Sequence, residues 1–103
     1  MNIVILGSGN VATHFAHNLH NQGHKIVQIF SQQKANAEAL AFAVHAEAIS
    51  AISAINKAAD LYLIAIPDHA IESVIAALPA DLTGIVVHFL GSFQYNGSYE
   101  IKR

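Results

Sequence analysis

The 103-residue sequence contains no cysteine, few cationic side chains and no long run of hydrophobic residues. Without cysteine, the chain forms no disulfide and performs no thiol chemistry. It has only five Lys and Arg residues, and Lys102 and Arg103 are two of them, so we expect no nucleic-acid partner. The apolar runs are too short to span a bilayer and the N-terminus does not resemble a signal sequence. These absences predict a cytoplasmic protein with no membrane partner.

Hydrophobic residues are abundant, at 53%, whereas charged residues amount to 12%. This composition is typical of a parallel sheet covered on both faces, whose strands read as continuous apolar runs. The apolar pattern predicts strands at residues 2–6, 25–30, 47–49, 61–66 and 85–89, with helices starting near residue 10 and at 33–44, 53–57 and 69–78. Strands that alternate with helices predict an α/β fold, a three-layer sandwich with a mostly parallel sheet of about five strands.

Polar residues and glycine mark the ends of the predicted helices. Asn10 is a good N-cap for the first helix, and Gly23 is well placed to stop it. Asp68 can cap the last helix, after Pro67 has ended the strand before it. Residues 94–103 lack helical periodicity and contain a turn at 95–99 that can form a small hairpin. We therefore expect one domain over residues 1–93, followed by an atypical tail at 94–103.

The first predicted strand runs directly into the turn Gly7-Ser8-Gly9-Asn10-Val11-Ala12. This is the G-x-G-x-x-A form of the dinucleotide fingerprint. Gly7 allows the tight turn, Gly9 lets a pyrophosphate approach the backbone, and Ala12 lets the helix pack closely on the strand. The N-terminus of that helix then faces the phosphates. Glycine turns also occur for purely structural reasons, but a turn between a strand and a helix favours a nucleotide site.

The end of the second predicted strand contains no Asp or Glu. In NAD-preferring proteins, an acidic residue at this place binds the 2′-hydroxyl of the ribose. The absence of this acidic residue favours NADP as the cofactor, with NAD as the alternative. It also counts against FAD. Ser31 and Gln32 can donate hydrogen bonds to a 2′-phosphate, and Lys34 can supply charge. Alternatively, Ser31 caps the second helix and Lys34 is a solvated surface cation.

Seven histidines raise the question of a metal site. His14, His17 and His20 follow each other at three-residue spacing on the first helix, opposite its apolar face, with no carboxylate or Cys nearby to complete a site. We therefore predict solvated imidazoles and no metal. His69 and His88 follow strand ends, where α/β sheets bind ligands. We expect His69 to be an ordinary residue of the first helical turn, whereas His88 is either bonded to backbone or turned toward a ligand. No carboxylates pair, so no catalytic residue is identified.

Four segments carry a family resemblance, at residues 3–14, 23–31, 59–68 and 87–92. With these, the chain resembles the Rossmann-like N-terminal domain of an uncharacterised family of bacterial oxidoreductase-like proteins. Its relatives are pyrroline-5-carboxylate reductases, deazaflavin-dependent NADP reductases and 6-phosphogluconate dehydrogenases. Two features depart from the family pattern. Gln32 stands where relatives often carry Arg, and the helical C-terminal domain is absent.

The resemblance implies a role for several positions. The resemblance implies that the pyrophosphate is bound by Gly7, Ser8, Gly9, Asn10 and Val11. Ser31 and Gln32 meet the adenosine ribose or its 2′-phosphate, and the ribose–nicotinamide side is lined by Ala65, Ile66 and Pro67. The substrate side is approached by His88, Gly91 and Ser92.

The resemblance also implies a function. It is that of an NADP(H)-binding domain of an oxidoreductase, which transfers a hydride to or from an unknown small substrate. We expect the chain to be a truncated form, inactive by itself, whose uncovered surface favours a homo-oligomer. Two alternatives stay open. One is a non-catalytic nucleotide-binding module, and the other is a domain that binds an adenine ligand such as S-adenosylmethionine.

Overall fold

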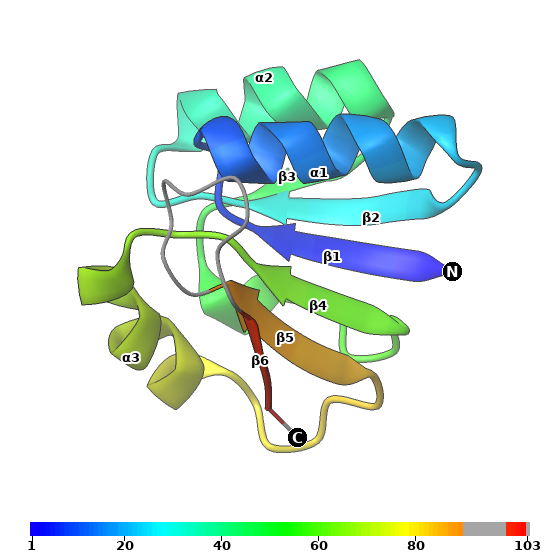
Figure 1. Ribbon diagram of the computed structural model, residues 1–103. Coiled ribbons are helices and arrows are strands. Elements are labelled where there is room, and N and C mark those ends of the chain that lie inside the picture. The colour runs from blue at the N-terminus through cyan, green and yellow to red at the C-terminus, as the bar shows by residue number, and fades with distance from the viewer. Residues whose placement is uncertain (90–98, 103) are drawn as a thin grey trace.

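Six strands form a single sheet in the order β3-β2-β1-β4-β5-β6 (Figure 1). The computed structural model describes residues 1–89 and 99–102. In chain order, the elements are β1 (Asn2–Leu6), α1 (Asn10–Asn21), β2 (Lys25–Phe30), α2 (Lys34–Val44), β3 (Glu47–Ile49), the 3-10 turn η1 (Ile52–Ala54), β4 (Leu61–Ile64), α3 (Asp68–Ala77), β5 (Ile85–Phe89) and β6 (Tyr99–Lys102). The first five strands are parallel, and β6 pairs antiparallel with β5. The predicted α/β fold with a mostly parallel sheet is therefore confirmed.

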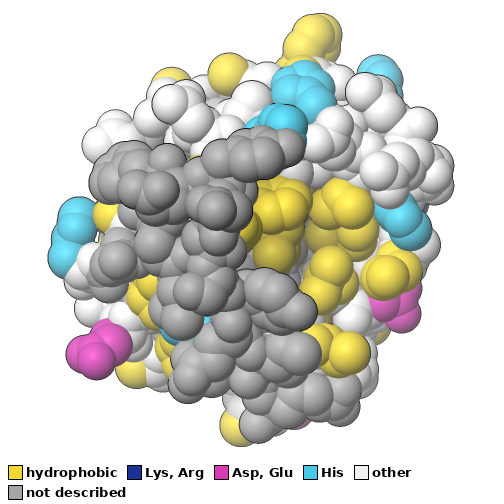
Figure 2. Space-filling model, in the orientation of Figure 1, with side chains coloured by type: hydrophobic (Ala, Val, Ile, Leu, Met, Phe, Trp, Pro, Cys, Tyr) yellow, Lys and Arg dark blue, Asp and Glu magenta, His cyan; other side chains and the backbone are white. Residues whose placement is uncertain are grey.

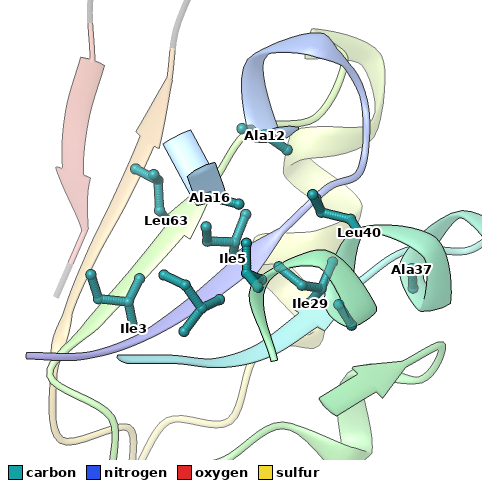
Figure 3. Close-up of a cluster of buried hydrophobic side chains, with 12 residues drawn as sticks. Ile3, Ile5, Ala12, Ala16, Ile29, Ala37, Leu40 and Leu63 are labelled. Atoms are coloured by element: carbon teal, nitrogen blue, oxygen red, sulfur yellow. The ribbon is translucent and has the colours of Figure 1, made fainter. Parts of the chain in front are cut away.

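The helices cover both faces of the sheet, with α1 and α2 on one side and α3 on the other (Figure 1). Side chains alternate between the two faces along each strand. In β1, Ile3 and Ile5 enter a core cluster under α1 and α2, whereas Val4 and Leu6 enter a second cluster on the opposite face. Figure 3 shows the first cluster, in which β-strand isoleucines meet the small Ala16 of α1. The predicted three-layer sandwich is thus present, with a separate core on each face.

The side of the sheet that carries α1 is only partly covered. Several hydrophobic residues that pack against the first cluster remain partly exposed, among them Phe15, Leu19, Leu61 and Val87. Figure 2 shows hydrophobic side chains at the surface between α1 and β5, where no helix of the described residues lies. None of the helices in the described part of the chain is long and apolar enough to cross a membrane.

Two predicted helix caps are displaced by one residue. The N-cap of α1 is Gly9, in an extended conformation, and Asn10 is already helical. Pro67 likewise precedes α3, and Asp68 is its first residue. Both helices therefore begin one residue earlier than the side-chain preferences for N-caps suggest. The carbonyl of each cap residue already accepts a hydrogen bond from the first turn. Thr13 N–H donates to Gly9 O at 2.9 Å, and Ala70 N–H donates to Pro67 O at 2.9 Å. The predicted stop at Gly23 is confirmed, since its φ of 94° favours glycine.

Other boundaries differ slightly from those expected. The strand β4 ends at Ile64 rather than at residue 66, because the chain leaves the sheet after Ala65 N–H donates to Leu6 O at 2.8 Å. The helix α2 begins at Lys34, one residue late, and the short helix expected at 53–57 is the 3-10 turn η1. The turn expected at 95–99 lies mostly outside the described residues. The division into residues 1–93 and a tail stays a prediction.

Tyr62 joins β4 to the loop before it. Its buried hydroxyl donates to Asn56 O at 2.5 Å and accepts from Ala59 N–H at 3.1 Å. Burial raises the pKa of Tyr62 above its ordinary value of 10.0; the Ala59 hydrogen bond lowers it, and the charges of Asp60 and Asp81 raise it. The neutral phenol is therefore the form that the fold favours.

We expect Tyr62→Phe to lower the free energy of unfolding by about 1–3 kcal/mol at pH 7, because Asn56 O and Ala59 N–H lose a buried partner. The raised pKa predicts the pH dependence. Stability that rests on the neutral phenol is complete below pH 10 and is lost as the pH rises further, because the unfolded chain ionises first. Urea denaturation at pH 7 and pH 11 measures both effects. The difference between wild type and variant should shrink at pH 11, and a constant difference would contradict the assignment.

Candidate functional site

A pocket of about 370 Å³ lies at the carboxyl ends of the parallel strands. In the sheet, β1 and β4 are neighbours, but the chain leaves β1 toward β2 and leaves β4 toward β5. The loops after these two strands therefore diverge, which opens a crevice at the place where α/β sheets bind ligands. The pocket is lined by all ten residues predicted to contact a cofactor: Gly7, Ser8, Gly9, Asn10, Val11, Ser31, Gln32, Ala65, Ile66 and Pro67. The three loops that follow β1, β2 and β4 thus contribute to one pocket lining.

Gly7 joins the ends of three strands. Its N–H donates to Phe30 O at the end of β2, at 2.7 Å. Its φ is 134°, and a Cβ at this position would overlap the carbonyl oxygen of Ala65, just beyond β4. Both facts require glycine here. Gly7 is therefore explained by the fold, whether or not a ligand binds.

Gly9 has no such structural requirement. Its φ of −78° is accessible to any residue, and no described atom beyond its chain neighbours lies within 4 Å of the place that a Cβ would take. The residue lines the pocket and precedes the first turn of α1, which contains no acidic residue and no side-chain cap. The bare backbone at Gly9 thus leaves room for a ligand at the positive end of the helix.

Ser31 holds the β2 loop in place. The Ser8 hydroxyl donates to Ser31 Oγ at 3.0 Å, and Gln33 N–H donates to the same oxygen at 3.2 Å. Ser31 is only 8% exposed, so it links the glycine turn to the end of β2. The alternative in which Ser31 caps α2 is wrong, because the N-cap is Gln33. Lys34 is exposed and is not among the described lining residues.

The electrostatic character of the pocket is nearly neutral. Among the described lining residues there is no Asp, Glu, Lys or Arg, and His69 is the one titratable side chain. The sequence interpretation treated His69 as an ordinary residue of the first helical turn, yet it is exposed and lines the pocket. The other lining residues that were not predicted are Phe30, Gln33, Ala70, Val74 and Phe89. These are mostly apolar, which suits contact with a flat ring.

Of the three residues expected on the substrate side, His88 is the one that the structure describes, and it does not line this pocket. His88 is 5% exposed in β5 and is absent from the described lining. It lies on the same face of β5 as Val86, which belongs to the core under α3. Phe89 points to the opposite face, where its ring centroid is 5.3 Å from that of Phe15, and it lines the pocket instead. Gly91 and Ser92 lie outside the described residues.

The histidines of α1 form no metal centre with the rest of the described chain. His14 and His17 are exposed, as predicted, and the His14 ring nitrogen Nε2 is 2.9 Å from the amide nitrogen of Asn18. The rings of His20 and His45 are 5.7 Å apart between centroids. Within the described residues, no group of three or more His, Asp or Glu side chains could hold a metal ion.

Comparison with known proteins gives a family and a fold. A family described as "NADP oxidoreductase coenzyme F420-dependent" matches residues 2–88. No curated protein matches the sequence.

Solved structures agree with the fold at low identity. A Bacteroides fragilis protein assigned as an NADP oxidoreductase is 21% identical, with a TM-score of 0.68 over 98% of this chain and 51% of that one. Arogenate dehydrogenase of Synechocystis is 18% identical, with a TM-score of 0.63 over 99% and 50%. A Thermoplasma acidophilum protein assigned as a methyltransferase is 15% identical, with a TM-score of 0.52 over 90% and 45%. The chain thus spans about half the length of these proteins.

Proposed function

The chain belongs to the coenzyme F420-dependent NADP oxidoreductase family, and we propose that its pocket binds NADP(H) through the residues that line it. It is a pyridine-nucleotide-binding domain of the oxidoreductase type. The observation that carries the proposal is Gly9. The fold does not require glycine at this position, whereas a pyrophosphate approaching the first turn of α1 does. The pocket also has the mostly apolar lining expected of a cofactor site.

Each of the three loops would hold a different part of the cofactor. Gly7 holds the turn against Phe30, and the backbone N–H groups that follow it, from Ser8 to Val11, would bind the pyrophosphate. The exposed Gln32 and Gln33 would meet the adenosine ribose, with Ser31 holding their loop against Ser8. The loop of Ala65, Ile66 and Pro67 would line the nicotinamide side. The cofactor supplies the hydride when it is bound, and the part of the protein is to bind and orient it.

The preference for NADP over NAD rests on what surrounds the ribose. The described lining carries no carboxylate to bind a 2′-hydroxyl or repel a 2′-phosphate. Gln32 and Gln33 can donate neutral hydrogen bonds to a phosphate oxygen. Neutral hydrogen-bond donors distinguish NADP from NAD less strongly than the guanidinium group of an arginine does. We therefore propose a modest preference for NADP.

The uncovered face of the sheet indicates where a partner of this chain would lie. We propose that the apolar surface between α1 and β5 faces a second polypeptide region, which completes the substrate side and excludes water. A second copy of this chain is one source of such a region. The substrate would be a small carbonyl, imine or hydroxy compound that exchanges a hydride with the nicotinamide. Gly91 and Ser92 stay candidates for the substrate side, whereas His88 faces the core under α3 and does not.

Calorimetric titration of the chain with NADP⁺, NAD⁺ and S-adenosylmethionine tests the proposal. We expect NADP⁺ to bind several-fold more tightly than NAD⁺ and S-adenosylmethionine not to bind. A non-catalytic module would give the same order of affinities but no hydride transfer when candidate substrates are supplied. If neither nicotinamide cofactor binds at millimolar concentration, the proposed function is wrong. Tighter binding of S-adenosylmethionine would favour the alternative adenine ligand.

A further inference from the structure

His69 is the one described residue of the pocket wall whose side chain can carry a positive charge. It lies in the first turn of α3, is exposed, and lines the pocket together with Ala65, Ile66 and Pro67 of the preceding loop. The glycine turn at the start of α1 lines the same pocket. An imidazole gains or loses its proton between pH 5 and 8. In its protonated form, His69 would therefore be the one positive charge among the described lining residues.

The expected ligand has the opposite charge. A dinucleotide carries two negative charges on its pyrophosphate, and NADP adds a 2′-phosphate. Taking the proposed binding of a nicotinamide dinucleotide as the premise, we propose that His69 in its imidazolium form binds a phosphate of the cofactor. The affinity for the cofactor then rises as the pH falls. His69 would be a ligand-binding residue that makes cofactor binding pH-dependent, with no part in hydride transfer.

The charged groups around His69 are few. On its own helix, Asp68 precedes it, and the exposed Glu72 lies about one turn further on. The turn η1, which contacts α3, has only Ile52, Ser53 and Ala54. Lys34, beyond the β2 loop, is exposed and outside the described lining. Residues 90–98 contain no Asp, Glu, Lys, Arg or His. His69 is therefore the histidine best placed to make the affinity depend on pH.

The test is calorimetric titration of NAD⁺ and NADP⁺ at pH 5.5 and pH 8.0 into wild type, His69→Gln and His69→Arg. The oxidised cofactors are used because reduced nicotinamides decompose in acid. His17→Gln is the matched control, since His17 is an exposed helical histidine outside this pocket. Because the 2′-phosphate of NADP⁺ itself titrates near pH 6, the measured quantity is the ratio of wild-type to His69→Gln affinity at each pH.

We expect the ratio of wild-type to His69→Gln affinity to be about twofold to fivefold at pH 5.5 and close to one at pH 8.0, as for one partly screened charge pair. His69→Arg should bind tightly at both pH values, and His17→Gln should behave as wild type. A ratio above one for both cofactors identifies the pyrophosphate as the partner, whereas one seen only with NADP⁺ identifies the 2′-phosphate.

Two results overturn the inference. One is a ratio that does not change with pH while the cofactors still bind, which leaves the proposed function intact. The other is the absence of any binding by wild type at either pH, which removes the premise as well.

Discussion

Gly7→Ala is expected to lower the free energy of unfolding by about 2–6 kcal/mol, which is a large part of the stability of a domain of this size. Two costs add at this position. A φ of 134° strains any residue with a Cβ, and that Cβ would overlap the carbonyl oxygen of Ala65. Because the overlap is with backbone, no side-chain rotation relieves it. The ends of β1 and β4 would have to separate, and the bond from Gly7 N–H to Phe30 O would be strained.

Urea denaturation followed by circular dichroism measures this loss. Gly9→Ala is the matched control, since it adds the same methyl group two residues away, where no described atom beyond the chain neighbours lies within 4 Å. Its unfolding free energy should stay within about 1 kcal/mol of wild type, the usual range of a changed N-cap. Equal stability of the two variants would show that the approach of Gly7 to Ala65 is not a constraint on the fold.

The strands were well predicted because buried parallel strands have a strong signature. The bounds of β1, β2, β3 and β5 agree with the sequence interpretation. Most of them read as largely apolar runs between polar or glycine residues, as strands covered on both faces do. The exception is β3, which is three residues long and begins with the exposed Glu47. Helix starts were less predictable. Asn10 and Asp68 are the better cap residues, but the turns out of the sheet had already set the backbone at Gly9 and Pro67.

The pocket residues were predictable for a related reason. The carboxyl ends of parallel strands meet at one edge, so loops that follow different strands converge there. Sequence position alone is enough to place Gly9, Gln32 and Pro67 at that edge. It does not show which way a side chain points. His88 and Phe89 both lie at the edge, but alternation along β5 turns His88 to the face of the α3 core and Phe89 to the side of Phe15.

Contacts between distant residues were not predictable from local pattern. The approach of Gly7 to Ala65 depends on the register in which Leu6 pairs with Ile64. The exposure of His69 to the pocket depends on the rotation of α3 about its axis, which is set by the burial of Ile71 and Val74. Both are tertiary features, so a single sequence holds no local signal for them. The position of His69 directly after a strand end was the one available indication.

Gly9→Val is expected to abolish binding of NADP⁺ and NAD⁺ while leaving the fold intact. The extended conformation of Gly9 suits a β-branched residue, and the space beside it is open. The same space is where the proposed pyrophosphate would lie, so the valine side chain would exclude it. Gly9→Ala should weaken binding by about 10- to 100-fold, the loss expected when one or two charge-assisted hydrogen bonds are displaced.

Calorimetric titration gives the affinities, and urea denaturation of the same samples shows whether the fold has changed. Ala76→Val is the control for added bulk, because Ala76 is exposed on α3 and outside the described lining of the pocket. It should bind both cofactors as wild type does. The graded loss from glycine to alanine to valine is the informative result, since misfolding would reduce the bound fraction rather than the affinity. Wild-type affinity in Gly9→Val would mean that the dinucleotide lies elsewhere, and the open backbone at Gly9 would then be without a role.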